Sequence, residues 1–339
     1  MSDDLDVSAL RAAAAHEIAD GLTACQVAVA RDGEVVYFES FGSADDETRF
    51  GVASATKPIV ASATWHLIGE GLLDIDRRVV DYVPEFGTHG KDVVTVEQVY
   101  LMTCGFPTAP MEATEGADPA RRVARFAEWE LEYEPGTQYV YHGGSAHWVL
   151  AELIERLGGI DFRDYVEARV TRPLGLPRLL GIPRAEQTNI AQFSLPSQPT
   201  TRPGYDRAAM IEAGIPGGGG VMTAATLARF YQGVLHNPNG LWKPDVLADA
   251  TSNIRCTLPD PMMGLPANRT LGVVIGNGFG TTWGRSPTAY GWPGAGGQVG
   301  FAEPATGISF SFLQSGDADP INVFVRAIRM SELALELGR

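Results

Sequence analysis

The amino-acid sequence predicts a mixed α/β (α+β) fold, in which an antiparallel sheet flanked by helices is built from both ends of the chain. Three observations predict it. A helical pattern and a β-hairpin pattern open the chain, helical segments broken by proline and glycine fill the middle, and strand patterns return only after about residue 270. Because the strands at both ends need partners, we expect them to join in one sheet, with the helical region inserted between them.

The N-terminal part of the chain supplies the first helix and the hairpin. Residues 7–21 carry apolar side chains at helical spacing. Residues 24–42 then place Asp32-Gly33 between two apolar, β-rich runs, which is the strongest short-range signal of a hairpin. From Ser54 to about Leu73 the apolar residues return to helical spacing, and Gly71 lies near the expected end of that helix.

The rest of the chain gives the inserted helical region and the second half of the sheet. We expect helices at 94–102, 120–131, 145–159, 161–176 and 223–236, strands at 269–278, 296–304 and 307–316, and a last helix at 320–337. The predicted organisation is a discontinuous α/β sheet domain of residues 1–74 and 266–339, and a mostly helical domain of residues 75–265. The Ser54 helix would begin where the two meet, and such a junction is a preferred place for a ligand cleft.

Composition and charge exclude several classes of function. The chain has 339 residues, of which 45% are hydrophobic, and its net charge of −15 repels phosphate backbones and anionic lipid surfaces. We therefore expect neither nucleic acid nor a membrane as a partner. The N-terminus is acidic where a secretory signal is basic, and the three cysteines form no ligand cluster, which predicts a cytoplasmic protein. The histidines show no metal-ligand spacing, so we expect no metal and no cofactor.

The stretch GVASATKPIV at 51–60 carries the first chemical signal. It places Ser54 three residues before Lys57. A serine hydroxyl needs a nearby base to act as a nucleophile, and a lysine three residues further along a helix faces the same side. At a helix N-terminus the N–H of Ser54 would be free to bind an oxyanion. The alternative is that Ser54 is an ordinary N-cap and Lys57 a solvated residue of the first turn.

Four segments around this motif resemble the serine β-lactamase and penicillin-binding superfamily, in which S-x-x-K carries the nucleophile. They are 49–86, which contains Ser54 and Lys57, 94–107, 134–159, which contains a tyrosine motif, and 290–307, which contains W-x-G, and they follow the family's order. The chain looks most like the branch of class C β-lactamases and family VIII carboxylesterases. The resemblance implies a β-lactamase/DD-peptidase-like fold with the active site between the two domains.

The resemblance also implies roles for individual residues. Tyr141 would exchange a proton with Ser54 and the leaving group, and Lys57 would help to hold Tyr141 as a phenolate. The backbone N–H groups of Ser54 and Ala295 would together form the oxyanion hole.

Two of these assignments have a structural alternative in the sequence itself. Tyr133, Tyr139 and Tyr141 alternate as in a strand, which is also typical of core aromatics. Residues 294–297, GAGG, could equally be a flexible turn.

The sequence departs from the family pattern at two positions. Gly143 stands where the second motif has an asparagine that helps β-lactamases to bind the amide side chain of their substrate. Trp292-Pro293-Gly294 replaces Lys-Thr-Gly or His-x-Gly, and an indole cannot bind a carboxylate as an ammonium does. Since the W-x-G form is found among the family's esterases, both departures favour neutral esters. We expect Trp292, Gly294, Gly143 and His142 to contact substrate, with Trp292 lining the acyl or alcohol pocket; a structural role is the alternative for His142.

Two other patterns invite different interpretations. Gly143-Gly144-Ser145 begins like a G-x-S-x-G nucleophile elbow but ends in His147, so we expect Ser145 to be an N-cap. Glycines 217–220 lack the Gly-Lys-Ser/Thr ending of a phosphate loop, and the family has a glycine-rich turn near the rim of the active site here.

The predicted function is a serine hydrolase that cleaves small carboxylic esters through an acyl-enzyme on Ser54. The alternative is an acyltransferase that passes the acyl group to an amine or alcohol acceptor, and a β-lactamase or D-amino acid peptidase ranks below both. A non-catalytic binding protein on the same fold is a different class, and the presence of Ser54, Lys57 and Tyr141 argues against it. A small-molecule ester or acyl substrate is the partner we expect, and the sequence does not specify the oligomeric state.

Overall fold

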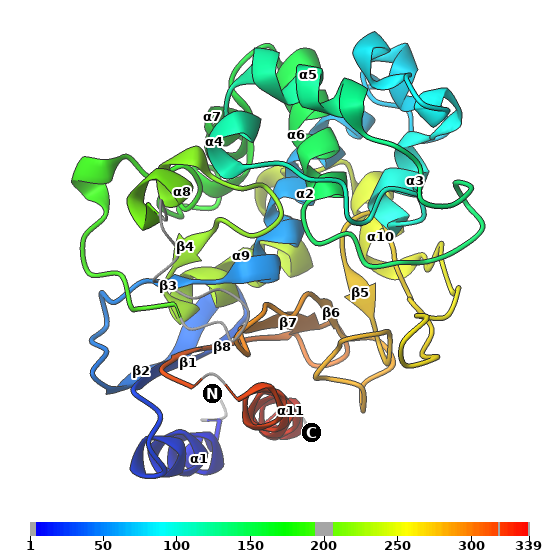
Figure 1. Cartoon of the computed structure of the whole chain (residues 1–339). Coiled ribbons are helices and arrows are strands. Elements are labelled where there is room, and N and C mark those ends of the chain that lie inside the picture. Colours follow the sequence, from blue (N-terminus) through cyan, green and yellow to red (C-terminus); the bar gives the residue numbers. More distant parts are fainter. Residues whose placement is uncertain (1–4, 194–205, 318, 338–339) are drawn as a thin grey trace.

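The computed structural model describes residues 5–193, 206–317 and 319–337. A six-stranded antiparallel sheet lies at its centre in the order β2-β1-β8-β7-β6-β5 (Figure 1). Strand β1 therefore pairs with β8, and the two ends of the chain meet in the middle of one sheet. This confirms the predicted fold class. The strands are β1 Ala24–Arg31, β2 Glu34–Gly42, β5 Val274–Ile275, β6 Tyr290–Gly291, β7 Val299–Glu303 and β8 Ile308–Ser315.

Strands β1 and β2 form the hairpin that the sequence predicts. Asp32 and Gly33 both adopt left-handed backbone conformations, with φ of 53° and 84°, as a tight two-residue hairpin turn requires. The pairing runs from Arg31 opposite Glu34 to Ala24 opposite Gly42. On its other edge β1 pairs with β8 along its whole length. Strand β1 is consequently an inner strand of the sheet and is almost entirely buried.

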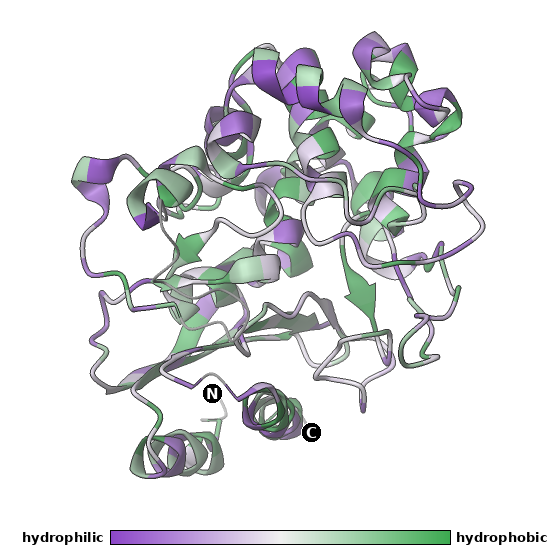
Figure 2. Ribbon diagram, viewed as in Figure 1, coloured by the Kyte–Doolittle hydropathy of each residue, from purple (hydrophilic) through white to green (hydrophobic). Residues whose placement is uncertain are grey.

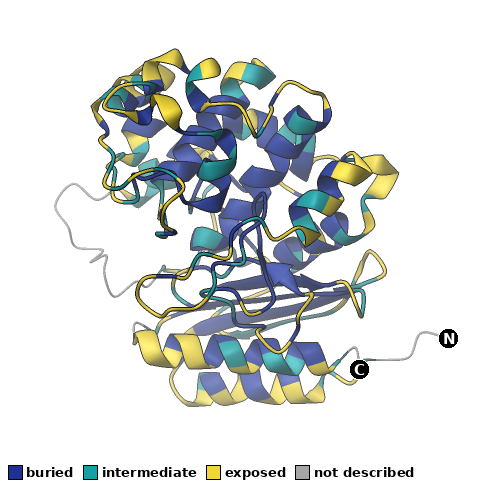
Figure 3. Cartoon of the chain, turned by 90° about the vertical axis from the view of Figure 1, so that its right-hand side faces the viewer, coloured by how far each residue is buried: buried dark blue, intermediate teal, exposed yellow. Residues whose placement is uncertain are grey.

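Helices cover both faces of the sheet. The terminal helices α1 (Ser8–Ala19) and α11 (Pro320–Glu336) lie side by side against one face, and α9 (Ala224–His236) packs on β1, β7 and β8 from the other (Figures 1 and 3). The outward sides of α1 and α11 are exposed, whereas their inward sides bury Leu10 and Met330 against Phe310 of the sheet. This layering is what the apolar spacing of the two terminal segments predicts.

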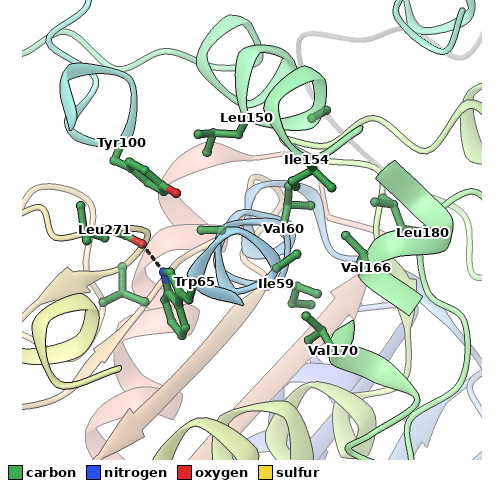
Figure 4. Close-up of a cluster of buried hydrophobic side chains, with 14 of the residues drawn as sticks. Ile59, Val60, Trp65, Tyr100, Leu150, Ile154, Val166, Val170, Leu180 and Leu271 are labelled. Carbon is green, nitrogen blue, oxygen red and sulfur yellow. Dashed lines mark hydrogen bonds between the residues drawn. The ribbon is translucent and has the colours of Figure 1, made fainter. Parts of the chain in front are cut away.

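The helical region is organised around α2 (Lys57–Gly69), which follows directly after the candidate nucleophile. Almost every residue of α2 is buried, so it is a core helix with little amphipathic character. Its side chains Ile59 and Val60 belong to a cluster with Ile154 of α6 and Val170 (Figure 4). The indole Nε1 of Trp65 donates to the carbonyl of Leu271, at 2.8 Å, and so ties α2 to the sheet segment. Hydrophilic residues instead gather on the outer helices (Figure 2).

The remaining helices and strands complete the fold. The α-helices are α3 Val96–Leu101, α4 Ala113–Gly116, α5 Pro119–Glu128, α6 Ser145–Gly158, α7 Phe162–Val166, α8 Arg207–Ala213 and α10 Pro244–Ser252. Helix α7 continues as a π-helical turn, η5 Glu167–Thr171. The 3₁₀ helices are η1 Ala53–Thr56, η2 Val79–Asp81, η3 Pro84–Phe86, η4 Lys91–Val93, η6 Arg184–Glu186 and η7 Pro238–Gly240. Strands β3 Phe50–Gly51 and β4 Val221–Met222 pair in a second, two-stranded sheet.

The structure differs from the predicted strands in two ways. Strands do not return only after residue 270, because β4 already pairs with β3 just before the nucleophile. The strand predicted at 269–278 is reduced to β5, since Gly272 bends the chain with φ of 130° against α2. A Cβ on Gly272 would lie only 2.4 Å from Cβ of Ala61, so this close approach requires a glycine.

Three further properties concern the described residues. None of their helices combines the length and the apolar character needed to cross a bilayer. They contain no group of three or more His, Cys, Asp or Glu side chains that could hold a metal ion. Cys25, Cys104 and Cys256 are free thiols, and all three are buried.

Candidate active site

Ser54 lies in the short helix η1, which runs directly into α2. The N-cap residues of the two helices are Val52 and Thr56, and neither helix has a side-chain cap from Ser54. The interpretation of Ser54 as an ordinary N-cap is therefore wrong. The residue before it, Ala53, has a left-handed φ of 46°, which is strained for a residue with a Cβ. Ser54 remains partly exposed to solvent.

Lys57 is fully buried and bonds Ser54 from within the same turn. Its Nζ lies 3.2 Å from Oγ of Ser54, 2.8 Å from the carbonyl oxygen of Gly143 and 2.6 Å from that of Gly217. An ammonium has three N–H donors, so these three oxygens satisfy it completely. Burial lowers the pKa of Lys57 below its ordinary value of 10.5, although the adjacent Tyr141 acts in the opposite direction. The interpretation of Lys57 as a solvated residue is wrong.

Tyr141 approaches the same serine from a distant part of the chain. A hydrogen bond of 2.8 Å joins its Oη to Oγ of Ser54, and Nζ of Lys57 lies 5.3 Å from the centre of its ring. Burial alone would raise the pKa of Tyr141. The positive charge of Lys57, the hydrogen bond with Ser54 and the positive charge of Arg269 outweigh burial and lower this pKa below 10.0. Residues 138–142 form no strand, so the strand alternation of the tyrosines is not realised.

The glycine-rich turn at 217–220, which the family resemblance places near the rim of the active site, packs against the nucleophile segment through contacts that the sequence did not predict. Besides the Gly217 carbonyl on Lys57, the N–H of Gly220 donates to Oγ1 of Thr56, and its carbonyl accepts from the N–H of Val52. A Cβ on Gly217 would lie 3.2 Å from Nζ of Lys57, and one on Gly220 would lie 2.7 Å from Oγ1 of Thr56. The turn is glycine-rich because its backbone packs directly on the nucleophile segment.

A cavity of about 280 Å³ opens in front of Ser54. Ser54, Gly143 and Ala295 line it, so the structure brings three of the predicted site residues together around one space. One charged residue, Arg207, also lines the cavity. Most of its surface is apolar, and the apolar wall consists of Phe193, Met210, Ile211, Ile215 and Val221.

The W-x-G segment reaches the site through its glycine and not through its tryptophan. Gly294 passes so close to the nucleophile segment that a Cβ there would lie 2.2 Å from the carbonyl oxygen of Val52. This contact places the next residue, Ala295, at the cavity, whereas Gly294 itself does not line it, so the substrate contact predicted for Gly294 is not seen. Trp292 is 2% exposed and does not line the cavity. Its ring packs against Arg269, His147 and Tyr141, so the prediction that Trp292 lines the acyl or alcohol pocket needs correction.

His142 and Ser145 have structural surroundings. The ring of His142 is fully buried, with Nδ1 2.6 Å from the carbonyl of Val140 and Nε2 3.3 Å from both Sγ of Cys104 and the N–H of Phe106. This placement argues against the substrate contact predicted for His142, because both ring nitrogens already have hydrogen-bond partners within the protein. Ser145 is the first residue of α6 and not its N-cap, and its hydroxyl donates to the Phe106 carbonyl.

Two buried side chains beside Tyr141 have no counterpart in the sequence prediction. His147 of α6 is 2% exposed, and neither of its ring nitrogens has a hydrogen-bond partner among the described residues. Burial lowers its pKa well below 6.5, so the ring is neutral. Arg269 is also 2% exposed and stacks on Trp292, with its guanidinium carbon 4.0 Å from the ring centre. Because Arg269 begins the strand expected at 269–278, nothing in the sequence indicated that its side chain would be buried.

Comparisons with known proteins bear on this geometry. The family model described as beta-lactamase matches residues 10–334. The esterase/beta-lactamase LipL of Mycobacterium tuberculosis is 25% identical over 317 residues, which cover 80% of this chain and 70% of LipL. The esterase EstB of Burkholderia gladioli is 29% identical over 269 residues, which cover 66% of this chain and 67% of EstB. The crystal structure of a family VIII carboxylesterase has a TM-score of 0.82 to this chain, at 25% identity, with 97% of each chain covered.

Proposed function

This chain belongs to the beta-lactamase family and is a serine hydrolase of that family, and from this premise we propose that it cleaves small carboxylic esters through an acyl-enzyme on Ser54. One observation carries the proposal. Oγ of Ser54 lies at the edge of a small, mostly apolar cavity and is within hydrogen-bonding distance of both Lys57 Nζ and Tyr141 Oη. A serine with two buried groups that can exchange its proton is the arrangement that nucleophilic catalysis needs.

Acylation begins with a proton transfer from Ser54 to Tyr141. With Tyr141 as phenolate and Lys57 as ammonium, the Ser54 hydroxyl gives its proton to Tyr141 while Oγ attacks the ester carbonyl carbon. The carbonyl π electrons move to oxygen, and the N–H groups of Ser54 and Ala295 bind the resulting oxyanion. When the carbon–oxygen bond to the alcohol breaks, Tyr141 returns the proton to the leaving alkoxide.

Deacylation repeats these steps with water. Tyr141, again a phenolate, takes a proton from a water molecule that attacks the acyl carbon, and it then passes that proton to Oγ of Ser54 as the acid leaves. Lys57 stays protonated throughout in this scheme, because the carbonyls of Gly143 and Gly217 keep two of its N–H groups engaged. The two carbonyls therefore orient the ammonium towards the reacting oxygen.

Two positions support esters over β-lactams. Gly143 offers no side-chain amide at the cavity, and the position of the third-motif lysine is taken by the buried Trp292. Both features remove groups that would bind the polar substituents of a penicillin. The name of EstB, an esterase, is in line with this ranking, whereas LipL is named both an esterase and a beta-lactamase.

The second candidate is transfer of the acyl group to an organic acceptor. The apolar wall formed by Phe193, Met210 and Ile215 favours it, because an apolar cavity can admit an amine or alcohol in place of water. The acyl-enzyme on Ser54 is the same in both reactions, and only the group that attacks it differs.

The test compares substrates and products. The turnover of p-nitrophenyl butyrate is expected to exceed that of nitrocefin by a large factor and to be lost in Ser54→Ala. Equal turnover of the two would overturn the ester preference. In the presence of a primary alcohol or amine, an ester hydrolase gives only butyric acid, whereas accumulation of the new ester or amide would establish the acyltransferase.

A further inference from the structure

Arg269 is a buried cation with an unusual set of neighbours. Its Nε and Nη2 donate to Oη of Tyr139 at 3.2 and 2.5 Å, and its guanidinium carbon lies 4.0 Å from the ring centre of Trp292 and 5.8 Å from that of Tyr141. Nη1 is buried without a hydrogen-bond partner in the described part of the chain. Over the same residues, no carboxylate lies within 4.0 Å of the guanidinium to form an ion pair.

A buried guanidinium without a carboxylate is costly unless another negative charge lies near it. Other buried arginines of this chain obey that rule: Arg122 pairs with Glu152, and Arg326 pairs with Glu17. For Arg269 the neighbouring groups that can become anionic are the phenols Tyr139 and Tyr141 and the thiol of Cys256. Burial raises the pKa of the Cys256 thiol, so this thiol stays neutral. Burial raises the pKa of Tyr139 despite Arg269, so Tyr139 stays neutral and accepts the hydrogen bonds. Tyr141 is then the group left to carry the compensating charge.

We propose that Arg269 is a positioning residue that, stacked on Trp292, supplies with Lys57 the positive charge that holds Tyr141 as a phenolate beside Ser54. The inference rests on the proposed function, since it assigns the charge state of the proton acceptor in that mechanism. It also explains the burial of Trp292. The indole ring packs against both the guanidinium and the ring of Tyr141. Neither Arg269 nor Trp292 lines the cavity, so the cation acts on Tyr141 from outside it.

The other groups that face Tyr141 do not replace Arg269. Lys57 of α2 is the first cation, and it is shared with Ser54 and two carbonyls. His147 of α6 and His142, which follows Tyr141 in the chain, are neutral, because burial lowers the pKa of both. Asp260, which raises the pKa of Tyr139, instead accepts the N–H groups of Met262 and Met263.

The test replaces the charge at position 269 and reads the protonation of Tyr141. Arg269→Gln and Arg269→Met remove the charge, and Arg269→Lys keeps it. Loss of a cation within about 4–6 Å typically raises the pKa of an anionic group by about one unit or more. The acidic limb of the kcat/KM profile is therefore expected to move to higher pH by about one unit in the two neutral variants, with KM unchanged, and to stay near the parent position in Arg269→Lys. Tyrosinate absorbance, measured as a difference from Tyr141→Phe, should move with it.

The matched control is Arg255→Gln. Arg255 lies on the segment whose backbone pairs with Arg269, but its guanidinium is already paired with Glu97 and Asp249, so the limb should not move. If the acidic limb of the kcat/KM profile does not move in a folded Arg269→Gln or Arg269→Met variant, the inference is overturned and the proposed function stays intact. Loss of the fold in both neutral variants, with Arg269→Lys folded and its limb displaced, would make the residue structural and also overturn it. Full activity in Ser54→Ala would instead refute the proposed function itself.

Discussion

Tyr141 and Ser54, which are 87 residues apart in the chain, are joined by a hydrogen bond of 2.8 Å between their hydroxyl oxygens. The contact exists because the loop before α6 lies next to η1, and in this loop the carbonyl of Gly143 also accepts a hydrogen bond from Lys57. One serine oxygen is thus within hydrogen-bonding distance of two groups whose pKa values are both lowered. A proton can therefore pass between Ser54 and Tyr141 beside the Lys57 ammonium, and this is the basis of the predictions below.

Replacement of Lys57 should abolish most of the activity. Lys57→Ala removes Nζ from Ser54 and leaves the Gly143 and Gly217 carbonyls without their donor. General acid–base groups typically contribute about 10²–10⁴-fold, so kcat/KM for p-nitrophenyl butyrate should fall by at least about 10²-fold. Lys243→Ala, at an exposed position, is the control. A Lys57→Ala enzyme with the parent's kcat would contradict the role given to this lysine.

The pH profile of the enzyme should report Tyr141. The phenolate is the reactive form, so kcat/KM is expected to rise as pH increases through the pKa of Tyr141, which is held below 10.0. In Tyr141→Phe this acidic limb should disappear and kcat/KM should fall by about 10²–10⁴-fold. Tyr133→Phe, which removes only a 3.4 Å hydrogen bond to the Met102 carbonyl, is the matched control. An unchanged acidic limb in Tyr141→Phe would assign the titration to another group.

Gly294 is expected to tolerate no side chain. In Gly294→Ala the new Cβ would lie 2.2 Å from the Val52 carbonyl oxygen, two residues before Ser54. Overpacking of this kind typically costs about 1–3 kcal/mol, and here the obstacle is backbone, so the free energy of unfolding should fall by about 2 kcal/mol or more. Urea unfolding measures this. Gly143→Ala is the control for stability, because its Cβ would meet nothing within 4 Å; equal stability of the two variants would refute the close approach.

The burial of His142 should make the fold less stable in mild acid. Burial lowers the pKa of His142 from 6.5 to about 4, so the neutral ring stabilises the fold above 6.5 and this contribution is lost as pH falls towards 4. The free energy of unfolding should therefore fall by about 2 kcal/mol as the pH decreases from about 7.5 to about 5. The pH dependence of urea unfolding should be weaker by that amount in His142→Gln than in the parent. An identical slope in His142→Gln would exclude His142 as the cause.

The sequence predicted the parts of the fold and site that depend on local patterns. The hairpin at Asp32-Gly33, the terminal helices and the pairing of Ser54 with Lys57 all follow from spacing within a few residues. The role proposed for Tyr141 came from the family resemblance, because its alternation with Tyr139 looked like a strand. Strands β3 and β4 have two residues each, too few for any periodicity to appear.

What the sequence could not predict are contacts between distant segments. Lys57 reaches the Gly217 carbonyl 160 residues away, and a run of four glycines does not indicate which side chain it will contact. Trp292 was expected at the substrate because of the W-x-G motif of the family's esterases, but Arg269 stacks on it and it lies in the core. Nothing local distinguishes this buried arginine from one at an exposed strand end.

The most direct test of the central claim is mass spectrometry of the protein after exposure to a phosphonate ester. The phosphonate phosphorus takes the place of the ester carbonyl carbon, and a serine that attacks it stays covalently labelled. We predict one phosphonyl group per chain, located on Ser54, together with loss of p-nitrophenyl butyrate hydrolysis and no labelling of Ser54→Ala. An adduct on another residue, or no adduct from an enzyme whose Ser54→Ala variant keeps full esterase activity, would contradict the account.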